Sequence, residues 1–180
     1  YMKMTSFKYE QDGDNYKVNA EYEISATSSK LAMTYTITST GDVIVNEKLT
    51  VDPEAKEKPQ LLRYGMEMAM PAEYSVIDFY GKGPQENYID RNNFARLGHY
   101  VQKVADQYYP YVRPQESGNK TEVRYWKVLD NAGKGLEFFS NASMECKSLN
   151  YLTEDLSSGN DKYAVQRHSG DLTPRDLTTV

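Results

Sequence analysis

The sequence predicts an all-β fold, arranged as an antiparallel β-sandwich, on three observations. Residues 16–24 (YKVNAEYEI) alternate between apolar and polar side chains, which is the period of a half-buried strand. Residues 31–38 (LAMTYTIT) alternate in the same way. Further short segments of this kind follow along the chain, and turns rich in Gly, Pro, Asn and Asp separate them, as is typical of sandwiches.

The first half of the chain is predicted to form a meander. The turn STGD at residues 39–42 leads into VIVNEKLTV at residues 43–51, so three antiparallel strands are expected in succession. A charged surface loop, DPEAKEKPQ at residues 52–60, then separates this part from the rest. Residues 61–70 are apolar at alternate positions near their end, which predicts a buried strand with inward Met66, Met68 and Met70 rather than a methionine-rich binding face.

The second half continues as strands and shaped loops. Strands are predicted at residues 74–80 (YSVIDFY) and 122–129 (EVRYWKVL), and LEFFS after residue 135 extends the sheet. Residues 94–107 have a mixed period, which leaves open whether they form one short helical turn plus a strand. Residues 108–119 (YYPYVRPQESGN) predict a rigid polar and aromatic loop, and a helix start is expected at Thr153.

Composition limits the class of partner. A chain of 180 residues suggests one domain, and its formal net charge of −5 argues against nucleic acid or an anionic membrane as a partner. No apolar run approaches the roughly 20 residues that a membrane helix needs. Bacterial cytoplasm or periplasm is therefore favoured over a membrane, although the compartment itself stays undetermined. The sequence begins at Tyr1 and ends at Val180 without the features of natural termini, so a piece of a longer polypeptide is expected.

The central stretch YGKGPQENYIDR, residues 80–91, is the candidate functional loop. Its two glycines free the backbone for positive φ, and its proline fixes one φ angle. Polar groups then crowd into six residues. Composition alone favours a hydrogen-bonded structural turn over a ligand site. The candidate site residues in this loop are Gly81, Gly83, Pro84, Glu86, Asn87, Tyr88, Asp90 and Arg91.

No residue of the chain is predicted to be catalytic. Four carboxylates lie on or near the two loops, and glycosidase chemistry needs such a pair. Turn capping or ion pairing with Arg91 explains Glu86 and Asp90 at least as well. His99 and His168 have no partner at the spacing of a metal site or a triad. Cys146, the one cysteine, is expected to be a small buried hydrophobe, so no metal site is predicted. The carboxylates in question are Asp78, Glu86, Asp90 and Glu116.

Three sequence motifs carry a family resemblance. YGKGPQENYIDR, then PYVRPQESGNKTEVRYW and then GKGLEFF resemble, in order and spacing, the C-terminal domain or small chain of β-galactosidases in glycoside hydrolase family two. The likeness runs from about residue 16 to about residue 156. It implies that residues 1–180 are a single, partial C-terminal domain of a larger β-galactosidase. It also implies an antiparallel β-supersandwich similar to galactose mutarotases.

The resemblance also implies a role for the central loop. In this family both catalytic glutamates belong to an upstream (β/α)₈ barrel, so the barrel is the expected partner and this chain alone is expected to be inactive. The loop then borders the mouth where a terminal β-galactoside is hydrolysed, with Gly81 and Gly83 as hinges and Pro84 as a stiffener. No cofactor is expected in this chain, and Mg²⁺ or Na⁺ of the parent enzyme would sit in the barrel. A homo-oligomer is compatible with the resemblance.

One family feature is missing, and two alternatives stay open. The family's sugar-stacking tryptophan lies in an Asp-Ser-Trp-like turn that this chain lacks, because Trp126 belongs to the different motif VRYW. The first alternative is a stand-alone carbohydrate-binding module, which the sixteen tyrosines would suit. The second is a structural domain that braces the barrel and an oligomer.

Overall fold

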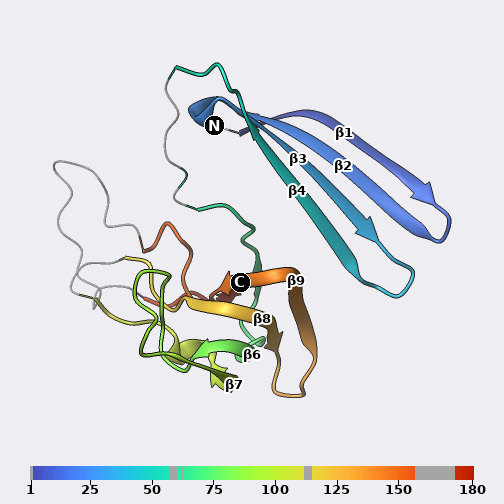
Figure 1. Ribbon diagram of the computed structural model, residues 1–180. Coiled ribbons are helices and arrows are strands. Elements are labelled where there is room, and N and C mark those ends of the chain that lie inside the picture. Colours follow the sequence, from blue (N-terminus) through green and yellow to red (C-terminus); the bar gives the residue numbers. More distant parts are fainter. Residues whose placement is uncertain (1, 57–60, 62, 112–114, 157–172) are drawn as a thin grey trace. The chain divides into compact units, whose positions relative to one another are not determined.

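The computed structural model describes residues 2–56, 61, 63–111, 115–156 and 173–180, and within them the protein is all-β (Figure 1). Every strand pairing is antiparallel, as predicted. Helical structure in these residues is limited to two short 3-10 turns, Ser25–Thr27 and Val104–Asp106. No helix there is long and apolar enough to cross a membrane. Contacts divide the chain into two compact units, Tyr1–Tyr64 and Gly65–Val180.

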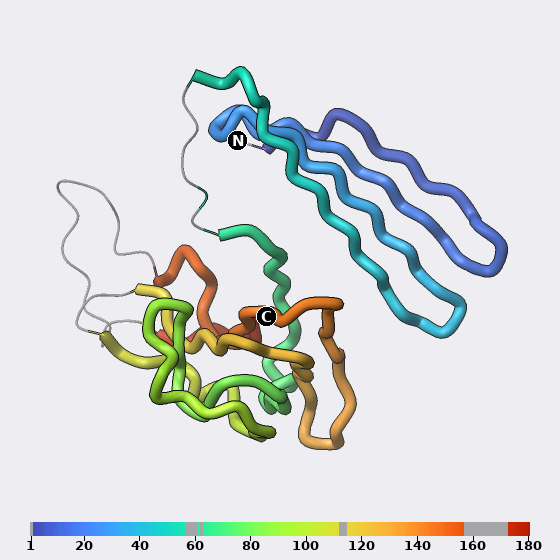
Figure 2. Tube along the Cα trace, viewed as in Figure 1, coloured from blue at the N-terminus to red at the C-terminus, as the bar shows by residue number. Residues whose placement is uncertain are grey.

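The first unit is one four-stranded sheet whose strands follow each other in chain order, as the tube in Figure 2 traces. The predicted meander is confirmed, and one further strand precedes it. Gly13 and Gly41 take φ angles of 61° and 94° in the two tight turns, a backbone conformation that side chains rarely adopt. The strands are β1 (Met2–Asp12), β2 (Asn15–Ile24), β3 (Ser29–Ile37) and β4 (Val43–Val51).

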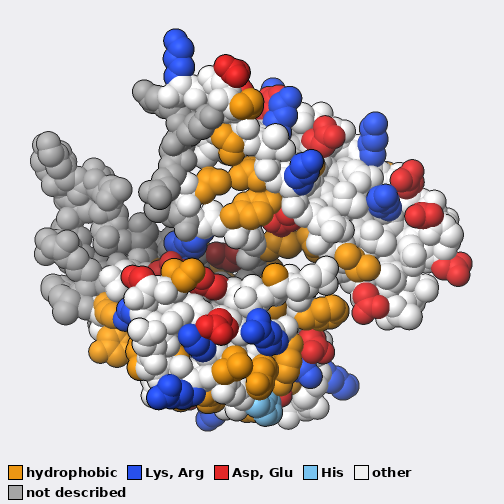
Figure 3. All heavy atoms as spheres, viewed as in Figure 1, with side chains coloured by type: hydrophobic (Ala, Val, Ile, Leu, Met, Phe, Trp, Pro, Cys, Tyr) orange, Lys and Arg blue, Asp and Glu red, His pale blue; other side chains and the backbone are white. Residues whose placement is uncertain are grey.

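Alternation gives this sheet one apolar and one polar face. Tyr9, Val18, Tyr35 and Val45 stand opposite one another across the four strands, and most side chains at the intervening positions are charged, threonine or asparagine. Figure 3 shows Lys and Arg side chains interspersed with Asp and Glu on the visible surface.

The second unit contains a four-stranded sheet in the order β7-β6-β8-β9 and a two-stranded sheet of β5 and β10. Its central strand β6 continues directly into the candidate loop. The strands are β5 (Ala69–Pro71), β6 (Val76–Gly83), β7 (Arg96–Lys103), β8 (Lys120–Leu129), β9 (Gly135–Cys146) and β10 (Leu177–Thr179).

One face of the larger sheet carries the core of this unit. Phe79 of β6 and Trp126 of β8 are fully buried, and their ring centroids lie 4.8 Å apart. The Trp126 indole donates a 3.0 Å hydrogen bond to Ser148, so its polar edge is satisfied inside the core. Cys146 packs against this cluster, and burial, with a smaller contribution from Glu145, raises its pKa to about 12. An inert, packed thiol is what the sequence predicted.

Two predictions about local structure need correction. The buried strand expected at residues 61–70 is wrong, because Leu61, Met66 and Met68 are exposed, and Met70 is the one buried residue of this range that the structure describes. Strand β5 covers only Ala69–Pro71, and the pairing with the C-terminal segment extends back as far as Met68, which exchanges backbone hydrogen bonds with Val180. The helix start expected at Thr153 is a turn, in which the Leu152 amide donates to the Asp155 carboxylate.

The open question about residues 94–107 is also resolved. Strand β7 comes first and the 3-10 turn Val104–Asp106 follows it. The strand pairs with β6 along its whole length, which brings the end of the candidate loop back beside its start.

Candidate functional site

The two glycines of the candidate loop lie inside strand β6 rather than in a turn. Neither Gly81 nor Gly83 has a positive φ, so the sequence-based reason for them is wrong. They are needed for close packing instead. A Cβ atom at Gly81 would lie 3.0 Å from the Val123 Cα, and one at Gly83 would lie 3.0 Å from the Tyr100 ring. The Gly83–Pro84 peptide bond that follows is cis.

Asn87 is the anchor of the loop. It is fully buried, and its side-chain amide donates to the carbonyl oxygens of Lys82 at 2.9 Å and Gln85 at 3.0 Å. Its side-chain oxygen accepts from the Thr121 amide at 3.0 Å and the Thr121 hydroxyl at 2.6 Å. Its backbone exchanges hydrogen bonds with Asn119 in the second loop. One side chain therefore ties the incoming arm of the first loop to the start of β8.

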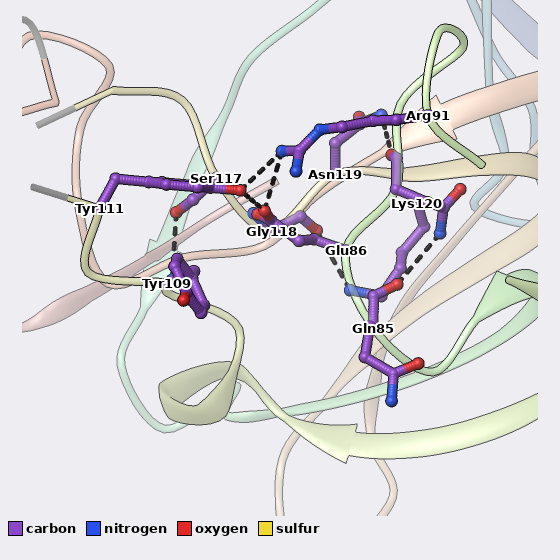
Figure 4. Close-up of polar contacts among 10 residues, drawn as sticks. Gln85, Glu86, Arg91, Tyr109, Tyr111, Ser117, Gly118, Asn119 and Lys120 are labelled. Atoms are coloured by element: carbon purple, nitrogen blue, oxygen red, sulfur yellow. Dashed lines mark hydrogen bonds and ion pairs between the residues drawn. The ribbon is translucent and has the colours of Figure 1, made fainter. Parts of the chain in front are cut away.

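Glu86 joins the two loops through its carboxylate (Figure 4). One oxygen accepts from the Tyr111 hydroxyl and from Arg91 at 3.0 Å, and the other accepts from the Gly118 amide at 2.7 Å. Gly118 has a φ of 82°, and a Cβ atom there would lie 3.0 Å from the Gln107 carbonyl oxygen. Glycine is thus required where the second loop presents its amide to Glu86.

Arg91 closes the tip of the loop. Its guanidinium lies 4.7 Å from the Tyr88 ring centroid and 5.7 Å from that of Tyr111, so it is held by two rings as well as by Glu86. Burial, with Glu86 and Glu116 nearby, raises the pKa of Tyr88. The Tyr88 hydroxyl is buried without a hydrogen-bond partner among the described residues.

The outermost residues of the loop face outward. Ile89 is 82% exposed and Asp90 is exposed beside it, in the tight turn where Tyr88 and Arg91 exchange backbone hydrogen bonds. The predicted ion pair of Arg91 is confirmed with Glu86. The structure thus brings Glu86, Asn87, Tyr88 and Arg91 together and leaves Asp90 at the surface.

A buried lysine lies under this cluster, and sequence reasoning missed it. Lys120 is 1% exposed, and its ammonium donates to the Gln107 side-chain oxygen at 2.8 Å and the Gly118 carbonyl at 3.3 Å. Burial lowers its pKa to about 8, although Glu86 acts in the opposite direction. Lysine is usually exposed, so composition gave no signal for this position.

Asp78 and Glu116, two other candidate acids, each have a polar partner. His99 lies 2.8 Å from Asp78 on the neighbouring strand, and Glu116 lies 3.3 Å from Lys147. His99 is solvated, as expected, but it does have a carboxylate partner across the sheet, which sequence spacing could not reveal. His168 lies outside the described residues. Within those residues no three His, Cys, Asp or Glu side chains gather as a metal site would require.

The chain matches, over residues 1–180, the family model described as the beta galactosidase small chain. A beta-galactosidase of Halalkalibacterium halodurans is 36% identical over 132 residues, which are 73% of this chain and 13% of that protein. A beta-galactosidase of Streptococcus thermophilus is 30% identical over 169 residues, which are 92% of this chain and 16% of the relative. The chain therefore spans only a small part of the length of these curated relatives. Because the family model covers the whole chain, the protein belongs to the beta galactosidase small chain family.

Proposed function

We propose that this chain is part of a β-galactosidase of glycoside hydrolase family two, and that it forms the C-terminal, galactose-mutarotase-like supersandwich of that enzyme. The catalytic glutamates would lie in a (β/α)₈ barrel outside this chain, which would also hold any Mg²⁺ or Na⁺. The substrate would be a terminal β-galactoside. Membership of the small chain family and relatives named beta-galactosidase support this proposal.

The role of the chain in that enzyme would be to present residues 84–91 as a fixed wall of the active-site mouth. One observation carries this step: Asn87 is buried and Glu86 is partly buried, and both are held by the second loop and the start of β8, whereas Ile89 and Asp90, which follow them, are exposed. A loop built in this way positions its tip without supplying a proton donor or a nucleophile. Such positioning and water exclusion can raise a rate by themselves.

The test is hydrolysis of a chromogenic β-galactoside by the full-length polypeptide that carries this chain. The double variant Ile89→Ala with Asp90→Ala removes the tip and keeps Glu86 and Asn87. Asp14→Ala is the matched control, because Asp14 is also an exposed acid in a tight turn. We expect the tip variant to lose at least tenfold in kcat/KM while the control keeps the parental value.

Measuring the assembly of the variant distinguishes this role from that of a structural domain that braces the barrel and an oligomer. If the tip variant loses activity because the protein no longer assembles to its parental mass in light scattering, the bracing interpretation replaces the wall. If it retains full activity and assembly, the loop has no part in turnover. A parent with no galactosidase activity would refute the proposed substrate.

A further inference from the structure

The outer face of the sheet β7-β6-β8-β9 carries a row of aromatic side chains. Tyr80 of β6 stands opposite His99 of β7 on one side and Tyr125 of β8 on the other, and Tyr125 stands opposite Phe139 of β9. Each ring follows or precedes an inward-facing aromatic residue, so the row lies on the face opposite the core. All four strands of the sheet therefore contribute one ring to a single line.

This aromatic row is open to solvent. Phe139 is 75% exposed and Tyr80 is 37% exposed, and the His99 side chain is 56% exposed. Neighbouring strands lie about 4.8 Å apart, so four rings in register cover roughly 14 Å. A surface of this length and flatness suits an extended ligand better than a compact one held in a pocket.

The polar groups beside the aromatic row are paired with one another. The Asp78 carboxylate accepts from His99 at 2.8 Å and from the Tyr125 hydroxyl at 3.3 Å. Lys127 lies 3.8 Å from Glu137 and 5.2 Å from the Tyr125 ring centroid. The face thus offers hydrogen-bonding groups at the edges of its rings without a patch of one charge. A neutral, hydroxyl-rich ligand complements it better than an ionic one.

We propose that this face binds a neutral polysaccharide or oligosaccharide; the choice of a galactose-containing one rests on the proposed function. A pyranose ring has an apolar face of C–H groups that packs on aromatic rings, and its hydroxyl groups project at the edge. Tyr80 and Phe139 would supply the stacking surface, and Asp78 would accept hydrogen bonds from hydroxyl groups. This binding is additional to the loop's role and holds whether or not residues 84–91 affect turnover.

Affinity electrophoresis of the 180-residue chain in gels containing soluble, neutral β-1,4-galactan tests this proposal, with calorimetry on galacto-oligosaccharides. We expect retardation of the parent chain and at least tenfold weaker binding for Phe139→Ala and for Tyr80→Ala. Both side chains are exposed, so circular dichroism should show an unchanged fold. Tyr9→Ala is the matched control, because Tyr9 is an exposed aromatic residue of the first unit and should leave binding unchanged.

Four results would overturn the proposal. The first is no retardation by neutral galactan at any concentration tested. The second is equal binding by the parent and both row variants. The third is self-association of the parent chain in light scattering that Phe139→Ala abolishes while no sugar binds, because the face would then be an interface between copies of the chain. Retardation only by an anionic polysaccharide such as polygalacturonate also counts against it.

Discussion

Replacing Asn87 by alanine is the strongest test of how the candidate loop is held. The substitution removes four side-chain hydrogen bonds at a fully buried position. Each is worth about 0.5–1.5 kcal/mol net, and Thr121 would be left with unpaired buried groups. We therefore expect a loss of roughly 3–5 kcal/mol in the free energy of unfolding. Urea denaturation of the 180-residue chain measures it, and amide exchange reports on Thr121 directly.

Asn93→Ala is the control for this prediction. Asn93 lies in the same loop region and is exposed, so its loss should change stability by less than about 0.5 kcal/mol. Equal effects of the two variants, or an Asn87→Ala protein with undiminished exchange protection at Thr121, would refute the anchoring role.

Three further predictions concern the surroundings of the loop. Lys120 has a pKa of about 8 in the folded protein against an ordinary value of 10.5, so above pH 8 the unfolded chain binds more protons than the folded one. The free energy of unfolding should therefore rise by roughly 2 kcal/mol between about pH 8 and about pH 9.5. Lys120→Met should abolish that rise in urea titrations, and a rise that persists would contradict the assignment. Gly118→Ala should destabilise by about 1–3 kcal/mol in thermal unfolding because φ is positive there, and no loss would contradict the required glycine. Trp126→Phe should cost about 2–4 kcal/mol in urea denaturation, since it opens a cavity and leaves Ser148 unpaired, and a neutral effect would mean that the core repacks.

Strands with one apolar face were predictable from the sequence. Residues 43–51 were predicted as a strand and form β4 with the same bounds, in which alternate residues from Val45 to Leu49 are half-buried and their neighbours are exposed. The prediction for β8 began at Glu122, two residues late. Lys120 and Thr121 are polar residues between the predicted loop and the predicted strand, yet both are buried, because other parts of the chain satisfy their polar groups. That compensation is invisible in a local pattern.

The glycines and methionines show where local patterns mislead. A pair of glycines fits a turn that needs positive φ and equally fits a strand that another strand approaches closely. At Gly81 and Gly83 the second reason applies, because Val123 and Tyr100 leave no room for a side chain there. Neither of these neighbours lies next to the glycines in the sequence, so the local pattern could not show it. Apolar residues do alternate at Met66 and Met68, but both side chains are exposed, because alternation buries a side chain only where another element packs against it.

The two loops of the candidate site were predictable from the sequence, but the contacts between them were not. The sequence pointed to Glu86, Asn87 and Arg91 as one polar cluster and to residues 108–119 as a second loop. The partners that make the cluster a single unit, Thr121 and Gly118, are more than thirty residues from the side chains they bind. Nothing in the spacing specifies that the two loops meet, because their contact depends on β6 and β8 being neighbours in the sheet.

These contacts bear on whether the loop opens and closes. Lifting residues 84–91 would break the hydrogen bonds of Asn87 and those of Glu86 together. At about 1 kcal/mol for each bond, the opened state would lie on the order of 5 kcal/mol above the closed one, which corresponds to a population near ~10⁻⁴. A ligand would have to favour the open state by a similar free energy to populate it. A fixed wall therefore explains this loop more economically than hinges at Gly81 and Gly83, both of which are held within strand β6.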